Sequence, residues 1–188
     1  MKISDGEKLI LLMLSEIYDR LGMDEGISPE FIRSAIFSNN LWGIPWKYSG
    51  IPFEDQEDPE IVREVLDILD MWSIIEYSYK ELSSEEKAQL EEIAAPFGKD
   101  PKFPGFDGNN ESSYMGTASF IVNELDRFEE FKGRDFNSHF PSLDGHRRML
   151  YAFGKVRDQM SFGPISLGEL ALILKERIHP SRRNTSSE

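Results

Sequence analysis

The amino-acid sequence predicts an all-α fold, with about seven helices packed around one long central helix and no significant sheet. Apolar residues recur at helical spacing along nearly the whole chain. A serine followed three positions later by a glutamate opens several of these runs, as expected for a capping box. No run alternates apolar and polar residues for more than a few positions, so the sequence carries no strand signal.

The first 53 residues predict two helices and an irregular segment. Ser4 and Glu7 form a capping pair before the first helix, and Gly22 ends it. The apolar stripe of this helix contains Leu9, Met13, Ile17 and Leu21. Ser28 and Pro29 open the second helix, which reaches Asn39. In the aromatic stretch 41–53 prolines and glycines are expected to prevent a regular helix.

The longest helical pattern follows Pro59 and is the predicted centre of the fold. Its apolar residues are spaced by four and three positions in alternation: Ile61, Val65, Ile68, Trp72, Ile75 and Tyr79. This spacing is typical of one continuous buried stripe. Trp72 is therefore expected to be buried.

The second half predicts four more helices, separated by polar loops. A polar helix opens at Ser83 and ends before Pro96, and another runs from the glycine-rich loop at 103–114 through Phe128. The loop 133–139 leads to a helix carrying Leu143, Leu150 and Phe153, and the last helix extends from Ser166 to Ile178. We expect a single domain at 1–180, with a seam at 96–108 between its halves, and a disordered tail at 181–188.

Composition and charge exclude several classes of protein. The absence of cysteine rules out disulfides, thiol catalysis and cysteine-ligated zinc. No apolar run approaches a membrane span and no secretory signal is evident, so a cytoplasmic protein without membrane association is expected. Residues 1–100 contain 22 acidic and 9 basic residues and carry the whole net charge of −13. This acidic half disfavours nucleic acid as a partner. It is either a solvated surface or a face that docks a basic partner or mimics a polyanion.

Four segments of the chain resemble a known family. The first is the loop 103–114, which reads Phe-Pro-Gly-Phe-Asp-Gly-Asn-Asn-Glu-Ser-Ser-Tyr. The others are Leu-Asp-Ile-Leu-Asp-Met-Trp at 66–72, Asn-Ser-His-Phe-Pro-Ser-Leu at 137–143 and Arg-Arg-Met-Leu at 147–150. They resemble segments of the YfbU-like family of uncharacterised bacterial proteins. Relatives commonly carry an aromatic residue where this chain has His146. The resemblance implies no settled activity.

Catalytic and cofactor motifs are incomplete. Only one Glu-x-x-His pair occurs, Glu176 with His179, whereas a helical di-metal site needs two, so no metal is expected. No Gly-x-Ser-x-Gly or Walker pattern is present, and the adjacent Ser138 and His139 are better explained as loop residues. These observations favour a protein that is not an enzyme and needs no cofactor.

The two polar loops nevertheless contain a candidate site. Residues that could converge there on a small molecule or support hydrolase-like chemistry are Asp107, Asn109, Tyr114, Asn137, His139 and Arg148. Turn and cap formation explains the same residue types. The discriminating feature is whether these side chains point into one cleft.

Protein–protein binding is the favoured function, by self-association as a homo-oligomer (a dimer or higher) or with another protein partner. Aromatic residues in the irregular segment, Trp42, Trp46 and Phe53, either cover the core or form an adhesive surface. Arg147 and Arg148 lie near the start of a helix, where the helix dipole disfavours cations. Their partners are therefore expected elsewhere, at Asp107, Glu111 or an acidic patch of another subunit.

Overall fold

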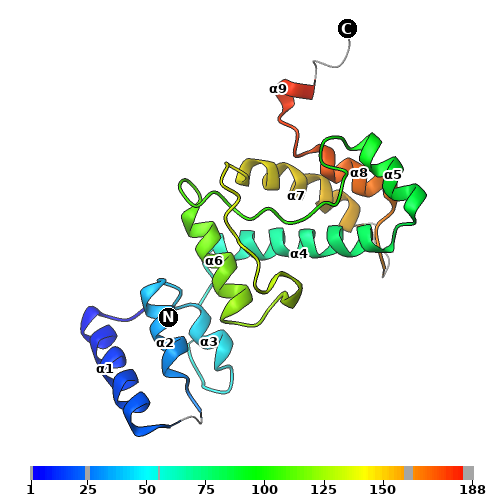
Figure 1. Ribbon diagram of the computed structural model, residues 1–188. Helices are drawn as coiled ribbons and strands as arrows, with labels where there is room; N and C mark the ends of the chain where they lie inside the picture. The colour runs from blue at the N-terminus through cyan, green and yellow to red at the C-terminus, as the bar shows by residue number, and fades with distance from the viewer. Residues whose placement is uncertain (1, 24–25, 55, 159–162, 184–188) are drawn as a thin grey trace. The chain divides into compact units, whose positions relative to one another are not determined.

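The computed structural model describes residues 2–23, 26–54, 56–158 and 163–183, and within these it is all-α (Figure 1). The helices are α1 (Asp5–Leu21), α2 (Pro29–Phe37), α3 (Gly43–Lys47), α4 (Glu60–Glu81), α5 (Ser84–Ile93), α6 (Ser112–Asn123), α7 (Leu143–Arg157), α8 (Leu167–Lys175) and α9 (Pro180–Arg183), with a short 3-10 helix η1 (Glu129–Phe131). The seven predicted helices correspond to those of nine or more residues. In the described part, β-type pairing is limited to one isolated bridge.

The predicted capping boxes are present in the structure. Ser4, Ser83 and Ser166 each accept a hydrogen bond from the backbone of the glutamate three residues later. In each case that glutamate side chain accepts one from the serine backbone in return. Local sequence alone therefore determines where α1, α5 and α8 begin.

The chain divides into two compact units. The first contains residues 1–63 and 116–133, and the second contains residues 64–115 and 134–188. The stretch 96–108, where a seam is expected, lies wholly within the second unit. From residue 181 the chain continues in α9 to Arg183, and the rest of the expected tail, 184–188, lies outside the described residues.

The core of the first unit forms around α2. Phe31 of α2 contacts the Phe120 ring with centroids 5.6 Å apart, and Trp42 contacts the same ring at 5.5 Å. Helix α1 packs against α2, with the small, buried Ser15 on its inner side.

The core of the second unit forms on α4. The predicted stripe is confirmed at Val65, Ile68, Trp72 and Ile75, which have no exposed surface. Its two end residues, Ile61 and Tyr79, are only half-buried. Figure 1 shows α7 and α8 along one side of α4. Helices α7 and α8 pack together, and α8 also packs against α5.

Two local predictions were wrong. Helix α6 ends at Asn123 instead of continuing through Phe128. Asp126 and Phe128 both have a φ of 53°, which a right-handed helix cannot contain. The aromatic segment does include a short helix, α3. Pro45 is tolerated there because it lies in the first turn, where backbone N–H groups have no hydrogen-bond partner within the helix.

Candidate functional site

The two polar loops of the second unit lie side by side. Phe106 N–H donates to the Phe136 carbonyl at 2.8 Å, and Ser138 N–H donates to the Phe106 carbonyl at 2.9 Å. Gly105 permits this approach, because a Cβ there would lie 2.1 Å from the Phe136 oxygen, and its φ is 81°. The glycine in this loop is therefore a requirement of the backbone.

Asn137 locks the two loops together. Its Oδ1 accepts hydrogen bonds from the Gly108 and His139 backbone N–H groups, each at 3.0 Å. The His139 ring itself is exposed and lies 3.9 Å from the Asp135 carboxylate. The asparagine oxygen is thus committed to holding the backbone.

Asp107 is likewise committed to its own loop. Its carboxylate accepts a hydrogen bond from the Asn110 side chain and another from the Asn109 backbone at 3.0 Å. These two donors hold the pKa of Asp107 below its ordinary value. Asn109 therefore contributes backbone to this network.

Tyr114 belongs to a different cluster. Its hydroxyl donates to Glu64 Oε2 at 2.6 Å, and Arg147 donates to the same carboxylate from Nε at 2.7 Å and from Nη2 at 3.1 Å. The arginine hydrogen bond lowers the pKa of Glu64, whereas burial and the nearby carboxylate raise that of Tyr114. Arg147 therefore pairs with Glu64 of its own chain and not with the expected Asp107 or Glu111.

Glu111 instead caps α7. Its carboxylate accepts hydrogen bonds from the Ser142 backbone at 3.0 Å and the Leu143 backbone at 2.9 Å, at the start of that helix. Burial alone would raise the pKa of Glu111, but the backbone donors, led by Asp107, lower it overall. The helix dipole stabilises a carboxylate at this N-terminal position.

Arg148 caps the C-terminal end of α8. Its Nε donates to the Glu176 carbonyl at 2.9 Å and its Nη2 to the Arg177 carbonyl at 3.2 Å, just after α8 ends. The six expected site residues are therefore not gathered in one cleft. They are divided among the loop network, the Glu64 cluster and the end of α8.

Three residues outside the expected set organise the second unit. Trp72 Nε1 donates to His146 Nδ1 at 3.1 Å, and His146 Nε2 lies 3.0 Å from the Gly105 carbonyl. Burial lowers the pKa of His146 to about 4, so the ring is neutral at pH 7. The ring lies among Trp72, Phe103 and Phe106 and takes the place of an aromatic side chain.

A buried ion pair holds the start of the second polar loop. Arg134 donates from both terminal nitrogens to Glu76 at 2.7 and 2.8 Å, and the Phe103 backbone donates to the same carboxylate at 2.9 Å. The Glu76 side chain is 6% exposed and that of Arg134 is 30% exposed. This bidentate pair links α4 to both loops at once.

A pocket of about 280 Å³ opens beside α7 in the second unit. Arg148 and Arg177 line it together with His146 and several apolar side chains.

Sequence reasoning named neither Glu64 nor Arg177, since each acts through contacts with residues distant in the chain. Among the described residues no group of three or more histidine or acidic side chains is placed to hold a metal ion.

The aromatic residues of the first unit are partly committed to its interior. Trp42 is buried and donates from Nε1 to Asn40 Oδ1 at 2.9 Å, whereas half-buried Trp46 donates to Asp58 at 3.1 Å. Arg127 covers the Trp46 ring at 4.7 Å. Together with Phe53, the two tryptophans line a hollow of about 380 Å³.

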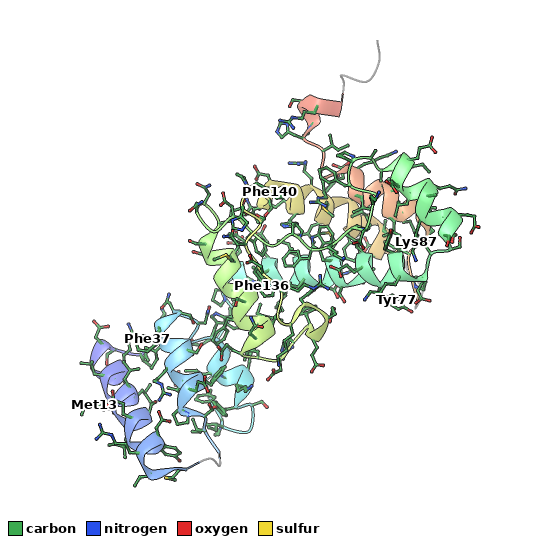
Figure 2. All side chains as sticks on the ribbon, viewed as in Figure 1. Met13, Phe37, Tyr77, Lys87, Phe136 and Phe140 are labelled. Carbon is green, nitrogen blue, oxygen red and sulfur yellow. The ribbon has the colours of Figure 1, made fainter. Side chains whose placement is uncertain are left out.

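The exposed apolar surface of the first unit lies on α1. Six large aliphatic side chains there are between 50% and 67% exposed: Leu9, Ile10, Met13, Leu14, Ile17 and Leu21. Met13 is labelled in Figure 2. This set contains all four residues of the apolar stripe predicted from the sequence, so that stripe faces solvent. The buried residue of α1 is Ser15. In the part of the chain that the structure describes, no helix is long and apolar enough to cross a membrane.

Comparison with known proteins identifies the family. The sequence profile of the YfbU domain matches residues 1–175. A relative from Methanocaldococcus jannaschii, named UPF0304 protein MJECS11, is 36% identical over 91 residues, which is 46% of this chain. The match spans about half of that relative, 51% of its length. Because the profile covers nearly the whole chain, the protein belongs to the YfbU family.

Proposed function

We propose that this protein acts through protein–protein binding, and that it pairs with a second copy of itself through the outer face of α1. The observation that carries the proposal is the set of six large aliphatic side chains exposed on that helix. Single exposed apolar residues are ordinary, but a contiguous row of them is typical of an interface.

The row has the geometry of a helix–helix seam. Ile10, Leu14, Ile17 and Leu21 are spaced by four, three and four residues, which places them on one stripe of α1. The 17 residues of the helix give the stripe a length of about 25 Å. Ile10 also lines an apolar hollow of about 380 Å³, so the apolar surface continues beyond the helix.

Burial of the exposed apolar row favours association. Completing the burial of six half-exposed aliphatic side chains contributes roughly 5–10 kcal/mol for each copy. Association costs about 4–15 kcal/mol in lost freedom of motion. Two copies contribute the seam twice, and the burial of both rows opposes this cost.

A second copy fits this surface better than an unrelated partner. A row at alternating four- and three-residue spacing complements an identical row, because side chains of one helix fill the gaps of the other. A twofold axis through the seam then satisfies both copies with one surface.

A structural role explains the polar residues of the second unit better than a catalytic role does. Asp107, Asn137 and Glu111 use their oxygens on backbone donors of the same unit. Arg148 likewise donates to backbone carbonyls. Groups committed in this way stabilise loops and helix ends.

A charge placed in the seam tests the proposal. In Leu14→Glu a carboxylate would have to be buried on association, so the dimer should dissociate while the monomer stays folded. Leu172→Glu is the matched control, because Leu14 is 50% exposed and Leu172 is 51% exposed, each on a helix. Analytical ultracentrifugation should give a dimer for the wild type and the control, and a monomer for Leu14→Glu. A monomeric wild type, or a Leu14→Glu dimer of unchanged affinity, would overturn the proposal.

A further inference from the structure

The pocket of about 280 Å³ in the second unit combines apolar walls with positive charge. The apolar walls come from Phe97, Pro104, Phe140, Pro141 and Met149. Phe140, labelled in Figure 2, is 49% exposed on the loop that leads into α7. Concave, mainly apolar surfaces with a few polar groups are the usual form of small-molecule sites.

Arg177 is the unusual residue of this pocket. Its guanidinium lies 4.2 Å from the centre of the Phe97 ring and 5.4 Å from that of Trp72. Burial lowers its pKa to about 10. Arg134, Arg147 and Arg157 each form an ion pair with a carboxylate. Among the described residues, no carboxylate forms an ion pair with Arg177.

A second arginine holds Arg177 in place. Arg148 also lines the pocket and donates to the Glu176 and Arg177 carbonyls, which fixes the backbone from which the Arg177 side chain extends. Asp144 is the acidic residue of the pocket lining and forms no ion pair with either arginine. The two arginines therefore outweigh its charge inside the pocket.

We propose that this pocket binds a small organic carboxylate, whose charge meets Arg177 and whose apolar body lies against Phe97, Phe140 and Met149. A desolvated cation without a counter-ion is costly, and a bound carboxylate offsets that cost. The planar guanidinium fork matches a carboxylate in two parallel hydrogen bonds.

Two features select a carboxylate over a phosphate. An anion that lacks a hydrocarbon body gains nothing from the apolar walls, because it has no apolar surface to bury against them. Asp144 repels a doubly charged phosphate more strongly than a singly charged carboxylate. The volume of about 280 Å³ accommodates a compact molecule, of the size of a single aromatic ring with a short side chain.

Isothermal titration calorimetry with a defined series of probes tests the site. The series contains acetate, benzoate and phenylacetate, with benzamide as the neutral analogue of benzoate and inorganic phosphate as the anion without an apolar body. We expect saturable binding of benzoate or phenylacetate, at least about tenfold tighter than that of acetate, benzamide or phosphate. Absence of saturable binding by every carboxylate would overturn the proposal, as would equal affinity for phosphate.

Variants of Arg177 locate the site. Arg177→Gln should weaken binding by about tenfold or more. Arg157→Gln, the same change at an exposed arginine of the same unit, should leave the affinity unchanged within about twofold. Arg177→Lys keeps the charge without the planar fork and should give an intermediate affinity.

A purely structural arginine would behave differently. Arg177→Gln removes both a desolvated charge and the contacts of Arg177 with the Phe97 and Trp72 rings, so its melting temperature is measured beside its affinity. If Arg177→Gln does not fold, the affinity of the Arg177→Lys protein is the deciding measurement. Wild-type affinity in both Arg177 variants would assign the arginine to structure alone and refute the site.

Discussion

The indole N–H of Trp72 donates to Nδ1 of His146 across 3.1 Å, deep in the second unit. This bond fixes the proton of the neutral imidazole on Nε2, which donates to the Gly105 carbonyl at 3.0 Å. One histidine therefore ties α4, α7 and the glycine-rich loop together. Its place is set by a tryptophan that precedes it by 74 positions.

The neutral state of His146 predicts a loss of stability in mild acid. The pKa is about 4 in the folded chain and about 6.5 in the unfolded chain. Between these values the unfolded chain binds a proton that the folded chain does not, so unfolding becomes easier as the pH falls from 7 to 4. This residue alone should remove about 3 kcal/mol from the free energy of unfolding over that range.

His146→Gln isolates this contribution. The difference in the free energy of unfolding between the wild type and the variant should shrink by about 3 kcal/mol from pH 7 to pH 4, because glutamine does not titrate there. Urea denaturation at both pH values measures it. A difference that does not vary with pH would show that the folded protein carries a charged His146.

The buried ion pair of Glu76 with Arg134 should be more sensitive than exposed pairs. Glu76→Gln removes the carboxylate that pairs with Arg134 and should cost roughly 1–3 kcal/mol, less than a fully buried pair because Arg134 is 30% exposed. The exposed pair of Asp100 with Lys102 is the control, and Asp100→Asn should cost about 0–1 kcal/mol. Equal costs in urea denaturation would mean that the burial of Glu76 has no energetic consequence.

The close approach of the two loops makes Gly105 intolerant of a side chain. In Gly105→Ala the new Cβ would meet the Phe136 carbonyl at 2.1 Å, at a φ of 81°. We expect a loss of roughly 2–5 kcal/mol. Gly116→Ala, inside α6 with no atom within 4 Å, should instead raise the stability by about 0.5–1 kcal/mol. Similar melting temperatures for the two variants would contradict this description of the loops.

Helical periodicity predicted most of the fold. The stripe that contains Trp72 identified the central helix, and the serine–glutamate pairs located three helix starts, because both signals depend on residues close in the sequence. The outer face of α1 shows the limit of this reasoning. Its apolar stripe indicates a helix, but the sequence does not reveal that the chain packs the Ser15 side inward.

The candidate site was less predictable for the same reason. Arg147 pairs with Glu64, which is 83 positions away, instead of with the expected Asp107 or Glu111. The contact of Arg177 with aromatic rings depends on residues distant in the chain, so no local pattern could identify it. Composition correctly indicated polar loops, yet only the fold shows that Asn137 and Asp107 hold backbone.

The dependence of self-association on salt tests the central claim most directly. The chain carries a formal net charge of −13, so two copies repel each other, and salt screens that repulsion without weakening an apolar seam. Sedimentation equilibrium of the wild type should show a dimer that tightens as sodium chloride rises from about 0.02 M to about 0.5 M. A protein that stays monomeric throughout, or a dimer that weakens with added salt as an interface of exposed ion pairs would, contradicts association through α1.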